Sequence, residues 1–250
     1  MGEALLGGLL DCGWASAGEL AVVEVDAARR SVLADRYGVA VSAEPLAGNG
    51  VVLAVKPADT AAAAKAAVAA GAGRLLSIAA GVTLGALQVA AGADVPLVRA
   101  MPNTPALVGK GAAAITGGEA AGEEDLVWAE SILSSVGTVV RVPEHLLDAV
   151  TGLSGSGPAY VFLVVEALVD AGVMVGLPRD VATALTTQTL LGSASLLAGS
   201  DDDAGALRAA VTSPGGTTAA GLRALETAGV RAAILDAVAA ATERSRQLGA

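Results

Sequence analysis

The chain has 250 residues, a hydrophobic fraction of 54% and a formal net charge of −10. This acidic balance excludes the electrostatic footprint expected of a protein that binds nucleic acid or an anionic membrane. The length suggests one or two domains, and the apolar fraction allows a sizeable core. Cys12 is the only cysteine, which excludes an internal disulfide and fits a reducing compartment.

Two uncharged stretches raise the question of a membrane segment or a secretion signal. Residues 181–200 carry no charged side chain, but Thr, Ser, Gln and Gly recur too often for a lipid-facing span. The apolar run at 4–10 lacks the positively charged start of a signal peptide, since the first basic residue is Arg29. We therefore expect a cytoplasmic protein in which residues 181–200 form a helix buried in a protein interface.

The first half of the chain predicts alternating strands and helices. Gly38 closes one predicted helix, and Pro57 opens another at the favoured first helical position. Short apolar strands that alternate with helices indicate an α/β fold with a doubly wound, Rossmann-like parallel sheet. The predicted strands are 20–25, 51–55, 75–78, 95–100, 112–116 and 138–142, and the predicted helices are 26–37, 57–70, 82–90 and 123–135.

The second half loses the strand pattern and reads as helices throughout. The change falls within residues 143–154. We therefore predict a dinucleotide-binding domain over residues 1–145 and an all-helical domain over residues 146–250. The predicted helices of this half are 161–173, 178–197, 204–211, 217–227 and 230–248.

The N-terminus is similar to a dinucleotide-binding unit without its opening segment. Such units open with an apolar strand and a G-x-G-x-x-G turn, whose backbone N–H groups meet the pyrophosphate. Here Gly2 stands in the place of the third glycine, and no strand precedes it. We expect that the first, central strand and the start of the glycine turn are missing. The alternative is a simple amphipathic helix at a true N-terminus.

The segment from Ser213 to Thr218 interrupts a helical, Ala-rich region with Pro214, Gly215 and Gly216. Glycine costs about 1 kcal/mol and proline about 3 kcal/mol inside a helix, so these residues end one helix before another begins. A helix N-terminus with bare backbone presents free N–H groups, which suit an anion such as a small carboxylate. The alternative is an ordinary turn between helices.

Six short motifs follow one another along the chain: Met1-Gly2-Glu3-Ala4-Leu5, Ala54-Val55-Lys56-Pro57, residues 77–83, residues 99–106, residues 153–160 and Ser213–Thr218. In this order and spacing they resemble the pyrroline-5-carboxylate reductase family along essentially the whole chain. The resemblance implies hydride transfer from NADPH, with NADH possible, to the cyclic imine of pyrroline-5-carboxylate, the last step of proline biosynthesis. It also implies a helical dimerisation domain that interlocks two copies into a homodimer, often assembled into a ring of dimers.

The resemblance also implies roles for individual residues. Thr218 would hydrogen-bond the ring nitrogen of the substrate as the catalytic residue. Asp201 would lie close to the substrate, although an exposed acidic run at 201–203 explains it equally well. The other substrate-binding residues would be Ser213, Gly215, Gly216 and Thr217, and the cofactor-binding residues would be Gly2, Asp26, Ala54, Val55, Lys56, Pro57, Ile78, Ala79, Ala80 and Asn103.

Two more of these assignments leave alternatives open. Asn103 orients the loop beside the nicotinamide or is only a turn residue between prolines. Asp26 would repel a 2′-phosphate and favours NADH, whereas Arg29 and Arg30 could hold that phosphate and favour NADPH. His145, the only histidine, lacks an acidic or cysteine partner in sequence, so we interpret it as structural and expect no metal site.

Two other classes of protein remain to be weighed. The first is a dimerising helical protein of this fold that has lost dinucleotide binding through its short N-terminus. The second is a hydroxyacid dehydrogenase of related architecture, which carries a catalytic lysine at the start of its second domain. Residues 154–166 contain no lysine, and the chain's lysines are Lys56, Lys65 and Lys110, which disfavours the second.

Overall fold

The computed structural model describes residues 1–249 and divides into two compact units. Unit 1 comprises Met1–Ser156 together with the chain from Ala239 onward, and unit 2 comprises Gly157–Val238. One helix, α11 (Val230–Gly249), therefore belongs to both units. The boundary expected between residues 145 and 146 remains a prediction.

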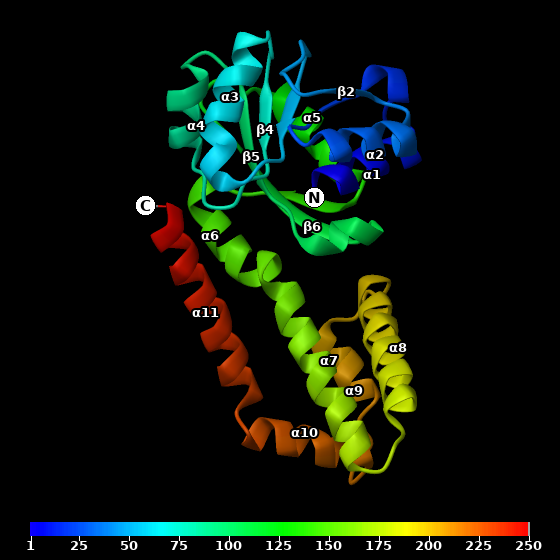
Figure 1. Ribbon diagram of the computed structural model, residues 1–250. Helices are drawn as coiled ribbons and strands as arrows, with labels where there is room; N and C mark the ends of the chain where they lie inside the picture. Colours follow the sequence, from blue (N-terminus) through cyan, green and yellow to red (C-terminus); the bar gives the residue numbers. More distant parts are fainter. Residues whose placement is uncertain (250) are drawn as a thin grey trace. The chain divides into compact units, whose positions relative to one another are not determined.

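Unit 1 is an α/β domain, which confirms the predicted fold class (Figure 1). Its larger sheet has the order β3-β4-β5-β6-β7, and a second, two-stranded sheet pairs β1 with β2 in parallel. The strands are β1 (Ala21–Val23), β2 (Ala40–Ser42), β3 (Val51–Leu53), β4 (Leu75–Ser77), β5 (Leu97–Met101), β6 (Gly111–Gly117) and β7 (Gly137–Arg141).

The sheet is interrupted between β1 and β3. β1 pairs only with β2, and β3 pairs only with β4, among residues 1–249. In a doubly wound sheet the first strand lies between these two, so the interruption falls where the sequence leads us to expect a missing central strand.

One strand pair departs from the parallel sheet that the sequence predicts. β5 and β6 run antiparallel, with Arg99 opposite Thr116. The residues between them, Pro102–Lys110, form only a short 3-10 segment, η3 (Thr104–Val108). A parallel connection needs a crossover of a dozen or more residues, so this short connection permits only the antiparallel pairing.

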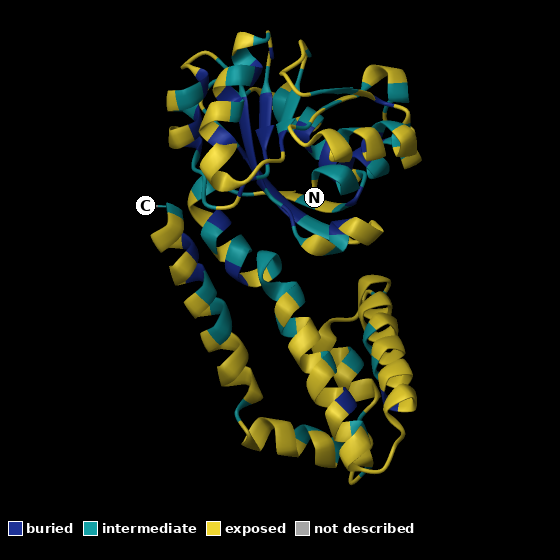
Figure 2. Ribbon diagram, in the orientation of Figure 1, coloured by how far each residue is buried: buried dark blue, intermediate teal, exposed yellow. Residues whose placement is uncertain are grey.

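The helices of unit 1 cover the sheet and bury its apolar core, and Figure 2 colours the buried residues dark blue. Asp26 begins α2 by accepting a hydrogen bond from the N–H of Arg29, and Gly38 ends it in the left-handed conformation at φ 65°. Leu76, Val98 and Ile115 lie in the centre of the core. These helices are α1 (Gly2–Asp11), α2 (Ala27–Tyr37), α3 (Thr60–Ala69), α4 (Leu84–Ala91), α5 (Glu123–Ser134) and α6 (Leu147–Val150).

The end of unit 1 is an irregular helical segment held by the C-terminal helix. A π-helical turn, η5 (Thr151–Gly155), follows α6 directly. The hydroxyl of Ser245, on α11, donates to a carboxylate oxygen of Asp148 at 2.7 Å. Ser245 is buried, so the last turns of α11 form part of unit 1.

Unit 2 contains only helices, and most of its residues are exposed (Figure 2). Gly172 and Ala182 bring α7 and α8 into close contact, since a Cβ at Gly172 would lie 2.9 Å from that of Ala182. Glu144–Met174 and Arg179–Ala198 are long and apolar enough to cross a membrane by length and composition alone. The helices are α7 (Gly157–Met174), α8 (Arg179–Ala198), α9 (Ala204–Ala210), α10 (Thr217–Thr227) and the start of α11.

Candidate active site

The predicted cofactor segments of unit 1 follow the carboxyl ends of parallel strands. Asp26 comes after β1, Ala54–Pro57 after β3, Ile78–Ala80 after β4, and Asn103 after β5. Ligands of open α/β sheets bind outside this edge, where strand ends and helix N-termini converge. The topology therefore brings the segments after β3, β4 and β5 to one edge of the larger sheet, whereas Asp26 follows a strand of the separate two-stranded sheet.

The N-terminus of α1 lies against the loop after β3. A Cβ built on Gly2 would be 3.0 Å from the Cβ of Ala54, so only a glycine allows this approach without displacement. Leu5 is the first residue of the helix whose N–H finds a helical acceptor, the carbonyl of Met1. The earlier N–H groups of the first turn point out of the helix end, which suits a phosphate.

The loops after β3 and β4 are held by their own backbones. The carbonyl of Lys56 accepts from the N–H of Asp59 at 3.0 Å and from the hydroxyl of Thr60 at 3.1 Å. The N–H of Ile78 donates to the carbonyl of Leu53 at 3.2 Å, which joins the two loops. These loops can therefore present backbone groups to a ligand in fixed positions.

The ribose end of the predicted site is rich in charge. The guanidinium of Arg29 pairs with Glu3 of α1. The backbone N–H of Arg29 donates to Asp26, the N-cap of α2. The hydrogen bond from Arg29 lowers the pKa of Glu3 below its ordinary value. Arg30 donates instead to the carbonyls of Glu24 at 2.7 Å and Val25 at 2.9 Å. Both guanidinium groups keep further N–H donors, because each carries five.

Sequence reasoning missed a partly buried cluster at the start of α4. A carboxylate oxygen of Glu144 accepts from the backbone N–H of Leu84 at 2.7 Å and from the guanidinium of Arg99 at 2.9 Å. Arg99 is buried within the sheet. The cluster fixes the far end of the loop that begins at Ile78. Its only sequence signal is an arginine inside an apolar strand, and that signal does not reveal a partner 45 residues away.

The predicted substrate segment lies in unit 2 and has the expected bare backbone. Gly215 adopts a left-handed conformation at φ 69°, and Gly216 begins α10 without a side-chain cap. The first helical donor is the N–H of Ala220, which reaches the carbonyl of Gly216 at 3.2 Å. The N–H groups of residues 217–219 therefore have no helical acceptor and are available to an anion.

Two of the remaining residues, Asp201 and His145, lie at the surface. Of the acidic run at 201–203, Asp203 caps α9 by accepting from the N–H of Ala206 at 2.8 Å. Asp201 is exposed just after α8. His145 is also exposed, and residues 1–249 contain no group of three or more His, Cys, Asp or Glu that could hold a metal ion.

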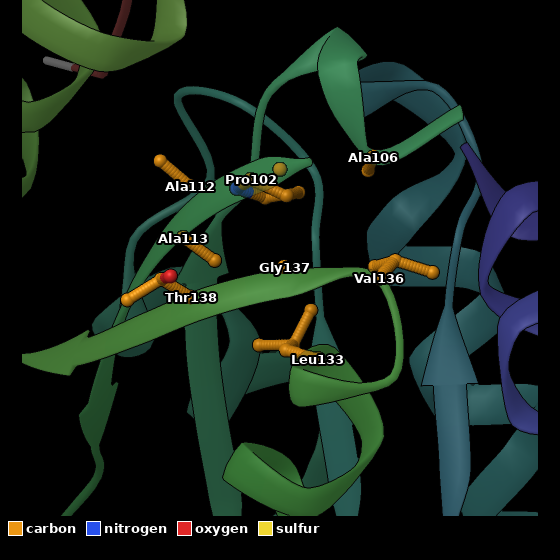
Figure 3. Close-up of a pocket in the computed structure, with 9 residues that line it drawn as sticks. Pro102, Ala106, Ala112, Ala113, Leu133, Val136, Gly137 and Thr138 are labelled. Atoms are coloured by element: carbon orange, nitrogen blue, oxygen red, sulfur yellow. The ribbon is translucent and has the colours of Figure 1, made fainter. Parts of the chain in front are cut away.

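A small cavity near η3 is not a ligand site. Figure 3 shows it between η3, the starts of β6 and β7, and Leu133 of α5. Its volume is about 10 Å³ and its lining is mostly apolar, including Pro102, Ala106 and Val136. Space of this size barely admits one water molecule, and water needs polar partners.

Comparisons with known proteins agree with this geometry. Residues 144–248 match the family model described as pyrroline-5-carboxylate reductase dimerisation. A pyrroline-5-carboxylate reductase of Synechocystis is 46% identical over 100% of this chain and 95% of its own length. That of Mycobacterium tuberculosis is 46% identical over 99% of this chain and 93% of its own length.

Solved structures give the same result. A pyrroline-5-carboxylate reductase from Coxiella burnetii matches with a TM-score of 0.94 and 32% identity, over 100% of this chain and 95% of that one. The Plasmodium falciparum enzyme, solved with NADP bound, matches with a TM-score of 0.86 and 30% identity, over 100% of this chain and 95% of that one. On this whole-length similarity, the chain belongs to the pyrroline-5-carboxylate reductase family.

Proposed function

We propose that this protein reduces pyrroline-5-carboxylate to L-proline by hydride transfer from NADPH, or from NADH. The observation that carries the proposal is the 46% identity, over the whole chain, to a relative that bears this name. The alternative of a helical protein that has lost dinucleotide binding is not favoured, because the four strand-end segments and the N-terminus of α1 are retained.

The residues of unit 1 fit a dinucleotide. The first-turn N–H groups of α1 would hold the pyrophosphate. The close approach of Gly2 to Ala54 places them beside the loop after β3. The carboxylate of Asp26 would accept from a ribose hydroxyl. Backbone groups of residues 54–57 and 78–80 would line the rest, with the loop that Asn103 orients at the nicotinamide end. A bound reduced nicotinamide supplies the hydride.

The residues of unit 2 fit the other reactant. The backbone N–H groups of Thr217 and of the two residues after it, in the segment that Ser213, Gly215 and Gly216 shape, would hold the substrate carboxylate, because the N–H of Gly216 itself donates to the carbonyl of Ser213 at 3.1 Å. The hydroxyl of Thr218 would accept a hydrogen bond from the protonated ring nitrogen. A protonated imine is already electrophilic, so the chain's task is to position it and stabilise its charge. Asp201 would add a negative charge near this site.

Assembly and location complete the proposal. α7 and α8 expose large apolar side chains such as Phe162, Leu163 and Leu185, as a dimerisation domain requires. We propose a cytoplasmic homodimer, assembled further into a ring of dimers, with the domain boundary at 145/146. Substituting Phe162 by Lys should weaken the dimer in analytical ultracentrifugation, whereas a matched change at exposed Val89 of unit 1 should not.

The direct test is nicotinamide oxidation by the purified protein with pyrroline-5-carboxylate, with NADPH and NADH assayed in parallel. Formation of proline at the rate of cofactor oxidation is the expected result. A folded dimer that binds neither cofactor would instead support the alternative of lost dinucleotide binding.

A further inference from the structure

The side chain of Asn103 has both ends of its amide occupied. Its oxygen accepts from the backbone N–H of Ala112 at 2.8 Å, and its NH₂ group donates to the carbonyl of Ser154 at 2.9 Å. The orientation of the amide is unambiguous, since an N–H can only donate and a carbonyl can only accept. Asn103 precedes η3, yet its side chain does not cap that turn.

The carbonyl of Ser154 cannot make an α-helical hydrogen bond. An α-helical carbonyl accepts from the N–H four residues later, and at that position Pro158 has no N–H. Ser154 also lies within the π-helical turn η5, which is closed by the N–H of Ser156 donating to the carbonyl of Thr151 at 2.8 Å. Isolated π turns cost stability and are found frequently at functional sites.

A second contact presses the same turn against the end of β5. A Cβ on Gly155 would lie 2.7 Å from the terminal methyl carbon of Met101, the last residue of the strand. Gly155 allows η5 to approach the end of β5, and the hydrogen bond from Asn103, two residues beyond Met101, holds η5 there. The hydrogen bond to Ala112 ties this arrangement to β6 as well.

We propose that Asn103 is a positioning residue, which tethers the π turn at Ser154 to the carboxyl edge of the sheet. The inference rests on the proposed function. α7, the first helix of unit 2, follows directly from η5, and unit 2 carries the proposed substrate segment. Reacting atoms displaced by 1 Å can lose about a hundredfold in rate, so a loose turn slows hydride transfer. Asn103 then acts through the turn and not by holding the cofactor.

Three variants separate this role from the others. Asn103→Ala removes both hydrogen bonds, whereas Asn103→Asp keeps an acceptor for Ala112 and loses the donor to Ser154. Ser131→Ala is the matched control, because it removes the hydrogen bond from the indole of Trp14 at 2.9 Å elsewhere in unit 1. For each variant we would measure kcat, the dissociation constant of NADPH, the kinetic isotope effect with deuterated NADPH and the exchange of the Ser156 amide hydrogen.

Both Asn103 variants are expected to lower kcat about tenfold or more. Their isotope effect should increase, their Ser156 amide should exchange faster, and their affinity for NADPH should be unchanged. Ser131→Ala should alter none of these. If Asn103→Asp matches the wild type in kcat and exchange, or if weaker NADPH binding accounts for the whole loss, the proposal is wrong. Wild-type turnover in the same assay reports separately on the proposed function, and the exchange measurement tests the tether without it.

Discussion

Gly2 lies against Ala54, and a Cβ at position 2 would come within 3.0 Å of the Ala54 Cβ. The contact joins the first turn of α1 to the loop after β3, two segments that the sequence separates by about fifty residues. It places the unpaired N–H groups of a helix N-terminus beside a loop predicted to bind cofactor.

A larger residue at position 2 should therefore weaken cofactor binding. Gly2→Val is expected to raise the KM for NADPH about tenfold, because its branched side chain separates α1 from the loop. Gly7→Ala is the control on the same helix: its Cβ would lie 3.6 Å from the ring of Tyr37, an ordinary contact. Alanine favours the helix by up to about 1 kcal/mol, so this control should keep its KM and gain stability. Equal KM values for Gly2→Val and the wild type would contradict the assignment.

The substrate segment predicts a different kinetic pattern. Thr218→Ala should lower kcat by about ten- to a hundredfold, the effect of losing one hydrogen bond to a charged group, with little change in cofactor affinity. Thr218→Ser keeps the hydroxyl and should recover most of the rate. Unchanged steady-state kinetics in Thr218→Ala would remove this residue from the site.

Gly216 tests the carboxylate site at the same helix end. A Cβ here would overlap the hydroxyl oxygen of Ser213, so Gly216→Val displaces that side chain and covers the exposed N–H groups. We expect a rise of about tenfold or more in the KM for pyrroline-5-carboxylate, with cofactor binding retained. Gly221→Ala, within the same helix and with open space at its Cβ, is the control. A normal KM in Gly216→Val would rule out the anion site.

Local signals in the sequence predict much of this fold. Asp26 and Gly38 mark the two ends of α2 because an Asp N-cap and a left-handed glycine act through their nearest neighbours. The breaks at Pro214–Gly216 likewise locate the start of α10. The strand β2 escapes prediction because Ala40, Val41 and Ser42 include a single large apolar residue, whereas the other three-residue strands lie in longer apolar runs.

Pairing over long range is what the sequence does not reveal. The antiparallel β5–β6 pair follows from the length of one connection, which a reading of apolar runs does not weigh. The tether from Asn103 to Ser154 and the cluster around Glu144 join groups 51 and 45 residues apart, respectively. Their geometry exists only once the sheet has formed, so the motif around Asn103 could suggest its importance but not its partners.

The choice between NADPH and NADH should depend on Asp26 and Arg29. Asp26→Asn keeps an N-cap of similar strength but removes a charge that repels a 2′-phosphate, so it should raise the ratio of kcat/KM for NADPH to that for NADH severalfold. Arg29→Ala should lower that ratio. Arg36→Ala is the control, because Arg36 also pairs with Glu3, at 3.0 Å, but follows a later turn of α2. If Arg29→Ala leaves the ratio unchanged, Arg29 serves only the ion pair with Glu3.

The ion pairs of Glu3 predict how stability depends on pH. Hydrogen bonding from Arg29, and then charge and hydrogen bonds from Arg36 and Tyr37, hold the pKa of Glu3 below its ordinary value of 4.5. A carboxylate whose pKa is lowered by folding stabilises the protein fully above its unfolded pKa and loses that contribution as the pH falls through the folded value.

Glu3→Gln should therefore cost about 1 kcal/mol of unfolding free energy at pH 7. The difference between the two proteins, measured by urea unfolding, should shrink as the pH falls below about 4.5. Other carboxylates with lowered pKa values, such as Glu123 and Glu130, are present in both proteins and cancel. A difference that stays constant down to pH 3 would show that Glu3 stabilises α1 through packing and not through its charge.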